Sequence, residues 1–240
     1  MCKKIINKFF IVCAIILCLC LVGCGGSGSG TGGQNKGEYD EKRYTFISQH
    51  TYTTTFNASD AKEALAKANA NLAKEKSFSY TISMFGENDE QHEYEGITKI
   101  DLTGASPLAS IELLGDLEFA FYIANNKAYL NQDGSKMAFD VEGDLSNLIN
   151  KVQGAIGSFT QFDENMIDDS SFVSGGVDEY NVTVIKFNYE EAREVTVVIY
   201  QDKIMKVLYT NEDLMEYTAN YNYEPVTVEL PSDLDEYVTE

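Results

Sequence analysis

Hydrophobic and polar side chains alternate one by one over several stretches of this chain, which is typical of strands with one apolar face. Other stretches are rich in β-branched and aromatic residues, which also favours strands. Together these stretches are residues 77–84, 113–123, 137–141, 182–189, 195–200, 204–210, 215–223 and 226–230. With an extended segment near the N-terminus, the sequence predicts about nine strands.

Two segments have the period of a helix instead. Residues 59–76 place Ala61, Leu65 and Ala68 on one narrow apolar stripe, and Asp60 followed by Glu63 predicts a capping box. The second helix is expected at 144–159. Its apolar face would be formed by Leu145, Leu148, Ile149, Val152, Ile156 and Phe159.

Short polar or glycine-containing joints separate the predicted strands. Reversals of the chain are expected at Asn125-Asn126, Asp133-Gly134, Gly175-Gly176, Glu190–Arg193 and Gln201–Lys203. The order of elements is helix, strands, helix, strands, without alternating βαβ units. This order predicts an α+β domain with helices on one side of a large antiparallel sheet, which about nine strands would curl strongly.

Two parts of the chain resemble LolA/LppX-type (LppX/LprG-like) bacterial lipoprotein domains. The run 61–68 followed by 77–81 resembles their opening helix and first strand, and the ending 220–231 is similar to their closing strands. The resemblance implies a half-barrel, a single curved antiparallel sheet covered on its concave side by two helices. Several members carry acyl chains there, which implies a hydrophobic pocket. No family binding residue is carried over, because no polar signature aligns.

The N-terminus is typical of a lipoprotein export signal. Three lysines precede an apolar run at 5–22, and Leu21-Val22-Gly23-Cys24 is similar to a lipobox. We expect removal of residues 1–23, acylation of Cys24, and a flexible linker over 24–37. A membrane-spanning helix is the alternative, but a polar glycine-rich stretch follows the apolar run in place of a basic flank.

Charge and cysteine content exclude several classes of function. The chain has 38 acidic and 18 basic residues, and loss of the signal's three lysines changes the net charge from −20 to −23. Such a surface disfavours nucleic acid and anionic headgroups. The other cysteines, Cys2, Cys13, Cys18 and Cys20, leave with the signal, so no disulfide or thiol site is expected.

After the linker, we expect an extended segment at 38–57 with a possible edge strand, and the half-barrel domain at 58–240. The alternating apolar positions are the candidate lining of a ligand pocket, unless they form an ordinary solid core. They are Phe78, Tyr80, Ile82, Met84, Phe119, Phe121, Ile123, Met215, Tyr217, Tyr221 and Tyr223.

Motifs for other chemistry are weak. Residues 28–33 spell G-x-G-x-x-G, but no strand precedes them and no helix follows. An acidic cluster could hold calcium, although a solvated loop is the simpler interpretation; it comprises Asp163, Glu164, Asp168 and Asp169. The two histidines, His50 and His92, lie in polar surroundings without a catalytic motif. We therefore expect no enzyme, no cofactor and no metal.

These observations favour a lipoprotein anchored through acyl chains on Cys24 to the outer face of the cell membrane. Its hydrophobic pocket would bind or carry a lipid or another lipophilic ligand. The alternative is a non-catalytic cell-surface module that binds a partner protein without a ligand cavity.

Overall fold

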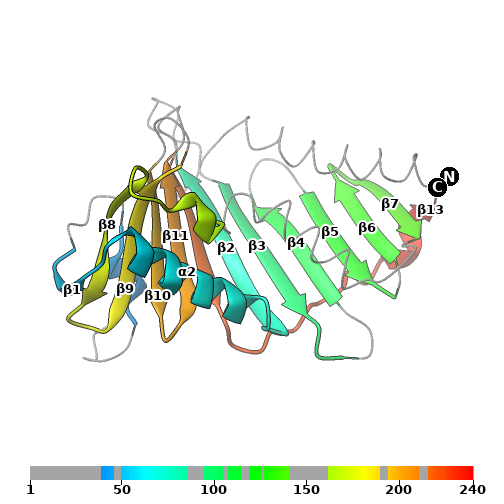
Figure 1. Ribbon diagram of the computed structural model, residues 1–240. Coiled ribbons are helices and arrows are strands. Elements are labelled where there is room, and N and C mark those ends of the chain that lie inside the picture. Colours follow the sequence, from blue (N-terminus) through cyan, green and yellow to red (C-terminus); the bar gives the residue numbers. More distant parts are fainter. Residues whose placement is uncertain are drawn as a thin grey trace.

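The chain folds around one large curved sheet (Figure 1). The computed structural model describes residues 39–45, 50–85, 94–104, 108–114, 119–125, 127–140, 162–189, 194–210 and 216–239. These residues form 13 strands, one α-helix and three short 3-10 helices. The helices are η1 (Glu41–Arg43), α2 (Ala58–Leu72), η2 (Glu164–Met166) and η3 (Leu234–Glu236). The strands are β1 (Tyr52–Thr55), β2 (Ser77–Phe85), β3 (Tyr94–Asp101), β4 (Leu108–Leu114), β5 (Phe119–Ala124), β6 (Lys127–Gln132), β7 (Ser135–Asp140), β8 (Phe172–Asp178), β9 (Val182–Asn188), β10 (Glu194–Tyr200), β11 (Lys203–Thr210), β12 (Glu216–Asn222) and β13 (Val238–Thr239).

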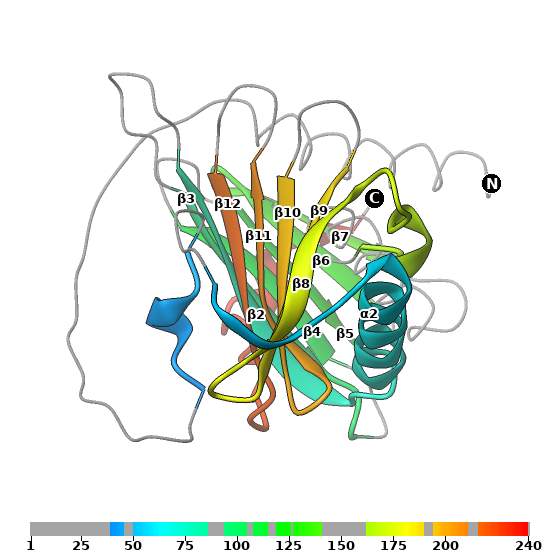
Figure 2. The ribbon, with the colours of Figure 1, turned by 60° about the vertical axis from the view of Figure 1, so that its left-hand side comes forward.

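Two up-and-down meanders, β2 to β7 and β8 to β12, are joined edge to edge where β12 pairs with β2. The full order is β1-β8-β9-β10-β11-β12-β2-β3-β4-β5-β6-β7-β13, and only the β13–β7 pair is parallel. The sheet is open and bends strongly, with α2 on its inner side (Figure 2). An antiparallel curved sheet was therefore predicted correctly, but the expected number of about nine strands was wrong.

Four strands were missed, namely β3, β6, β8 and β13, and the strand expected at 226–230 was wrong, because no strand lies between β12 and β13. Strands β3 and β6 carry apolar residues on both faces. Ile97 and Tyr129 point to the convex face, whereas Ile100 and Leu130 point to the concave face, so apolar and polar residues do not alternate clearly in these strands. The stretch 113–123 was also misjudged as one strand. It spans the end of β4 and most of β5, which pair as neighbours with Leu113 opposite Phe119.

Helix α2 begins at Ala58, one residue before the expected start at 59, and ends at Leu72, four residues before the expected end at 76. Asn57 is the N-cap: its Oδ1 accepts from the Asp60 amide, and the Asp60 carboxylate accepts from the Asn57 amide, both at 3.0 Å. The capping box is therefore Asn57 with Asp60, and the expected box of Asp60 with Glu63 was wrong. Beyond the cap, Ala61, Leu65 and Ala68 form the buried stripe as predicted.

Most described reversals follow the predicted turn chemistry. Asn125, Asp133, Gln201 and Asp202 have φ values of 50°, 48°, 51° and 59°, a region that asparagine and aspartate tolerate better than most residues. Gly134 follows at φ 78° and completes the β6–β7 turn. The expected turn at Glu190–Arg193 and the helix at 144–159 lie outside the described residues.

The expected turn at Gly175-Gly176 was wrong, because both glycines lie inside β8. Gly176 faces β1, which approaches very closely, and Gly175 faces Phe172 and the Val184 carbonyl oxygen. A Cβ atom on Gly176 would lie 2.1 Å from the carbonyl oxygen of Thr54 on β1. A glycine pair thus marks close backbone packing here, not a reversal.

Buried apolar residues form three clusters. The largest lies between α2 and the concave face of the sheet. Two smaller clusters lie on the convex face: one around Tyr44, Val184 and Leu208, and one around Tyr129 and Tyr237. The segment before β1 contributes Tyr44 to the first, and the C-terminal segment contributes Tyr237 to the second. Each terminal segment therefore covers one end of the convex face.

The capping box gives a test of the helix start. We expect Asn57→Ala to lower the free energy of unfolding by about 1 kcal/mol, because the Asp60 amide loses its acceptor. Ser59→Ala, in the same exposed first turn, should change it by no more than a few tenths of a kcal/mol. Urea denaturation compares the two. Equal stability of both variants would show that the capping box contributes nothing.

Candidate functional site

The concave face of the sheet is the candidate site, and strand pairing defines it. Across each antiparallel pair, opposite residues point to the same face. Starting from Phe78, pairing leads through Ile100, Ala109 and Ile123 to Ala128. In the other meander, Phe187 pairs with Val195 and Val195 with Tyr209. The concave face is therefore one continuous set of inward positions from β8 to β7.

No charged residue occupies a paired concave position among the described residues. Every paired concave position from β2 to β12 among the described residues is apolar, glycine, or a neutral polar residue such as Thr98, Gln132 or Thr183. The charged residues at paired positions of these strands all point to the convex face. They are Glu95, Lys99, Asp101, Glu112, Lys127, Lys136, Asp140, Asp178, Lys186, Glu194, Lys203, Lys206 and Glu216. In so acidic a chain, this separation of charged residues from the inner positions is the main chemical property of the concave face.

Tyrosines occupy the middle of the concave face. The rings of Tyr80 and Tyr221 lie 5.3 Å apart, as do those of Tyr209 and Tyr217. Burial raises the pKa of Tyr80, while a hydrogen bond with Thr98 acts in the opposite direction. The Tyr80 hydroxyl therefore stays neutral and can hydrogen-bond without adding charge.

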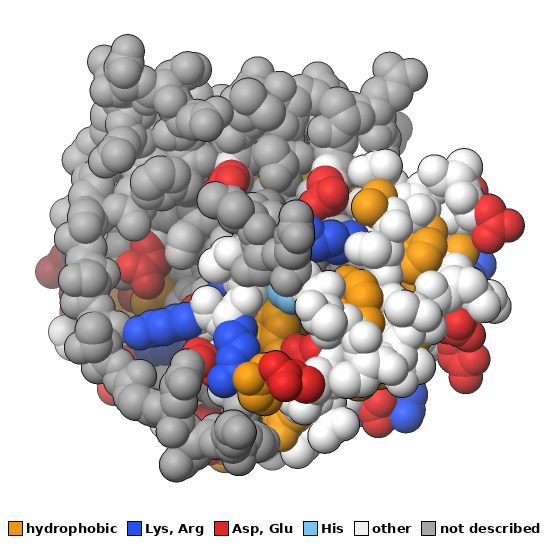
Figure 3. Space-filling model, turned by 90° about the vertical axis from the view of Figure 1, so that its left-hand side faces the viewer, with side chains coloured by type: hydrophobic (Ala, Val, Ile, Leu, Met, Phe, Trp, Pro, Cys, Tyr) orange, Lys and Arg blue, Asp and Glu red, His pale blue; other side chains and the backbone are white. Residues whose placement is uncertain are grey.

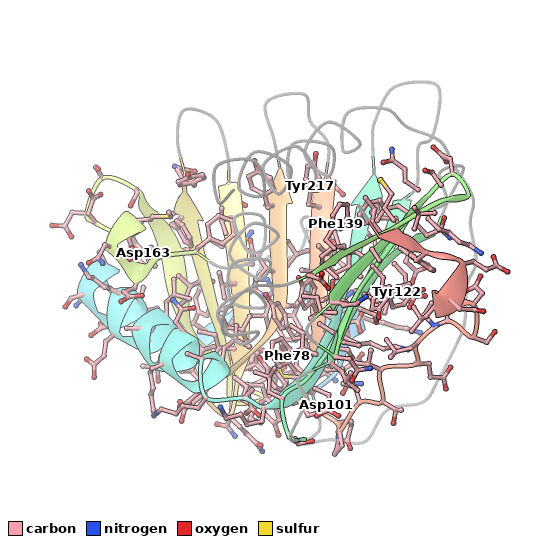
Figure 4. All side chains as sticks on the ribbon, turned by 90° about the vertical axis from the view of Figure 1, so that its right-hand side faces the viewer. Phe78, Asp101, Tyr122, Phe139, Asp163 and Tyr217 are labelled. Carbon is pink, nitrogen blue, oxygen red and sulfur yellow. The ribbon has the colours of Figure 1, made fainter. Side chains whose placement is uncertain are left out.

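The predicted lining residues largely come together. Phe78, Tyr80, Phe119, Phe121, Ile123, Tyr217 and Tyr221 are buried in the concave cluster, with Ile82 and Tyr223 half-buried against it. Figure 4 shows Phe78, Phe139 and Tyr217 on the inner side of the sheet and Tyr122 on its outer side. Met215 and the side chain of Met84 lie outside the described residues. That these residues line a ligand pocket stays a prediction.

Sequence reasoning missed several members of this face. Ile111 and Leu130 lie opposite Phe121, and Ile185 and Phe187 lie deep in the second meander. Phe162 covers Phe187 edge-on, with ring centroids 5.7 Å apart. The alternation of Leu108–Leu114 with its neighbours could have identified Ile111, whereas Phe162 lies in a loop and has no periodic signal.

Partly exposed apolar residues mark the accessible region of the concave face. Ile82, Leu113, Met137 and Phe139 are half-buried and come from β2, β4 and β7. Helix α2 lies elsewhere, since its main contacts are with β11, β8 and η2. The β2–β7 half of the concave face thus carries apolar side chains that α2 does not cover.

In the acidic loop, the carboxylates of Asp163 and Asp168 accept hydrogen bonds from nearby residues of the same loop. The Asp163 carboxylate accepts from the amide of Asn165 and caps η2. The Asp168 carboxylate accepts from the amides of Ser170 and Ser171 and from the Ser170 hydroxyl. These bonds lower the pKa of Asp168 to about 2. Within the described ranges, no group of acidic, histidine or cysteine side chains has an arrangement that could hold a metal ion.

The remaining sequence candidates lie away from the concave face. His50 stacks on Tyr44 on the convex side, with ring centroids 5.5 Å apart, and His92 is outside the described residues. Cys24, the linker and the G-x-G-x-x-G stretch are outside them as well. In the described part of the chain, no helix combines the length and apolar character needed to cross a bilayer.

Comparison with known proteins finds similarity only among solved structures. No family model and no curated protein matches the chain. It is similar to the lipoprotein LppX of Mycobacterium tuberculosis, with a TM-score of 0.40 and 12% identity over 72% of this chain and 100% of that one. A structure of the Pseudomonas aeruginosa MucA/MucB complex has a TM-score of 0.38 and 11% identity, over 70% of this chain and 59% of that one.

A LolA superfamily protein from Nitrosomonas europaea is also similar, with a TM-score of 0.29 and 8% identity over 72% of this chain and 96% of that one. The names of these structures agree with the LolA/LppX-like fold that the sequence resembles.

The hydrogen bonds of Asp168 predict a pH effect on stability. The pKa of its folded state lies below the ordinary value, so its contribution is present above about pH 4 and is lost as the pH falls toward 2. We expect Asp168→Ala to lower the Tm at pH 7 and the difference from wild type to shrink on acidification. Asp169→Ala is the matched control and should have little effect. A deficit in Asp168→Ala that is constant from pH 7 to 2.5 would contradict the assignment.

Proposed function

We propose that this chain is a membrane-anchored, non-catalytic lipoprotein whose concave sheet face binds a lipid or another lipophilic ligand. One observation carries the proposal: the charged residues at paired positions of β2–β12 point outward, whereas the inner face carries hydrocarbon, tyrosine and a few neutral polar groups. An ordinary solid core would need apolar packing alone, without accessible apolar surface. The half-buried Ile82, Leu113 and Phe139 support ligand contact, because they leave apolar surface accessible on the inner side.

The energy of such binding would come from burial of hydrocarbon. At about 0.8 kcal/mol per CH₂ group, a 16-carbon chain offers on the order of 10 kcal/mol before the cost of ordering. No charged contact is then needed for affinity. Among the described residues no cation occupies a paired inner position, which disfavours burial of an ionised headgroup, so such a group would stay at the rim in water.

Anchoring supports the same function. Acylation of Cys24 would hold the domain at the outer face of the cell membrane, where lipophilic molecules are available. The net charge of −23 after processing disfavours direct docking on anionic headgroups. The glycine-rich linker would give the domain a reach of about 20 Å from its anchor.

Adjacent residues of β2 provide a matched test. Ile82 points to the concave face between Ala219 and Gly96, and Ser83 points to the convex face between Thr218 and Glu95; both are half-buried. We expect Ile82→Lys to weaken uptake of a fluorescent fatty acid by roughly tenfold or more, because an ammonium would meet hydrocarbon. Ser83→Lys should bind like wild type. Fluorescence titration of the soluble chain from residue 25 onward measures both.

A second pair keeps the test valid if Ile82→Lys does not fold. Leu113→Trp would fill space on the concave face, and Glu112→Trp would place the same ring on the convex face. Circular dichroism verifies the fold of each variant. If folded wild type takes up no lipophile, or if the concave and convex variants bind equally, the proposal is wrong, and a protein-interaction module becomes the better account.

A further inference from the structure

The segment before helix α2 packs against the convex face as part of the domain. We call residues 39–45 and 50–55 the clasp. Its first part contains η1 and covers strands β9 to β11, and its second part contains β1, the edge strand paired with β8. Figure 3 looks onto this end of the molecule and shows acidic side chains scattered around hydrophobic ones. In the chain, the clasp lies between the linker and the half-barrel, so it connects the anchored end to the domain.

One buried hydrogen bond fixes the first part of the clasp. Tyr44 is 1% exposed, and its hydroxyl donates to Asp178 Oδ2 at 2.7 Å. The other oxygen of Asp178 accepts from the backbone amides of Tyr180 and Val182 at the β8–β9 turn. Asp178 therefore joins the clasp to the sheet through a fully engaged carboxylate.

Aromatic contacts extend this attachment along the clasp. Tyr39 stacks on Tyr44 with centroids 5.7 Å apart, and Tyr44 stacks on His50 at 5.5 Å. His50 in turn lies 6.4 Å from the ring of Tyr52 on β1. The guanidinium of Arg43 lies 3.5 Å above the Tyr180 ring. A row of rings thus connects both parts of the clasp.

Three buried polar groups weaken this otherwise well-packed contact. The Nε2 atom of His50 and the hydroxyl of Tyr39 are buried and have no hydrogen-bond partner among the described residues. Lys206 on β11 is 6% exposed, and within the described ranges its ammonium donates one long bond, of 3.4 Å, to the Glu41 carbonyl oxygen of the clasp. A buried ammonium with one weak acceptor costs free energy. These groups reduce the free energy that the clasp gains by docking.

We propose that the clasp is a releasable segment: docked at neutral pH, it shortens the membrane tether, and acidification releases it. His50 is the group that responds. In the docked state His50 is stacked on Tyr44 and lies tilted against Tyr52, where an imidazolium would have a buried N–H without an acceptor among the described residues. Release returns the ring to water and removes that cost.

The charges around His50 give the direction of the effect. Burial lowers the pKa of His50 below its ordinary value of 6.5; nearby Lys186 lowers it further, and Asp178 raises it. Lys186 itself pairs with Glu194 at 3.3 Å on the same face. The docked state thus binds fewer protons than the released state. Its stabilisation by neutral His50 is present above pH 6.5 and is lost as the pH falls through the lowered pKa.

Release would change the reach of the domain. With the clasp docked, a flexible tether from Cys24 to about residue 38 would reach about 20 Å; with the clasp released up to residue 57, it would reach about 30 Å. This consequence rests on the anchoring proposed above, whereas docking and release do not. The clasp would thus set how far the concave face stands from the membrane.

Hydrogen exchange tests the proposal on the full chain in phospholipid nanodiscs. After correction for intrinsic rates, we expect exchange of the peptide covering 39–45 to be slow at pH 7.5 and several-fold faster at pH 5.5, while α2 stays protected. Tyr44→Ala defines the released state, with fast exchange at both pH values. Wild-type exchange as fast as Tyr44→Ala at pH 7.5, or equal protection of wild type at both pH values, would overturn the proposal.

Two further variants separate the roles of the weak points. His50→Phe keeps a ring between Tyr44 and Tyr52 but cannot be protonated, so its pH response should disappear. Lys206→Met should slow exchange of the clasp, while Lys99→Met, on the same face of β3, should not. An unchanged pH response in His50→Phe would exclude His50 as the sensor and overturn the mechanism. The mass of the Cys24 peptide reports acylation separately, so a missing anchor is distinguished from a missing clasp.

Discussion

Strict alternation of side chains across a single twisted sheet is the constraint on which the rest of this structure depends. Strands β2–β12 must place the charged residues of their paired positions, both acidic and basic, on one face only, because the other face curves around α2 and its own side chains. A charge on the inner face would be buried beside hydrocarbon at a cost of several kcal/mol. The outward placement of Glu95, Lys99 and Glu112 therefore keeps the concave face apolar.

The convex face meets a different requirement, since a sheet that is curved and half exposed still carries apolar residues outward at both ends. Val184 and Leu208 lie under the N-terminal segment, and Tyr129 lies under the C-terminal segment. Near the C-terminus, Lys136 bonds to Asp233 and Glu236 and holds that segment against β7. The two termini thus complete the fold where the sheet alone would expose hydrophobic surface.

The sequence predicts the parts of this fold that have a clean period. The stripe of α2, the alternation of β2 and β12, and the turn at Asp133-Gly134 all follow local rules, and each was identified. The parts that depend on tertiary contact were not. Strand β6 has apolar residues on both faces because the C-terminal segment covers Tyr129 on the convex face, and Gly176 permits the approach of β1 instead of making a turn. For the candidate site, the residue types were predictable, but the complete separation of charge was not, because it depends on pairing registers across many strands.

Native mass spectrometry of the protein purified from its own membrane is the most direct test of the concave face as a ligand site. The account predicts a population whose mass exceeds that of the acylated chain by a discrete, noncovalent increment. Collisional activation should release this increment as a lipophilic molecule. A single mass equal to the acylated chain alone, together with no uptake of added lipophile, would contradict the account and leave the concave face as a solid core.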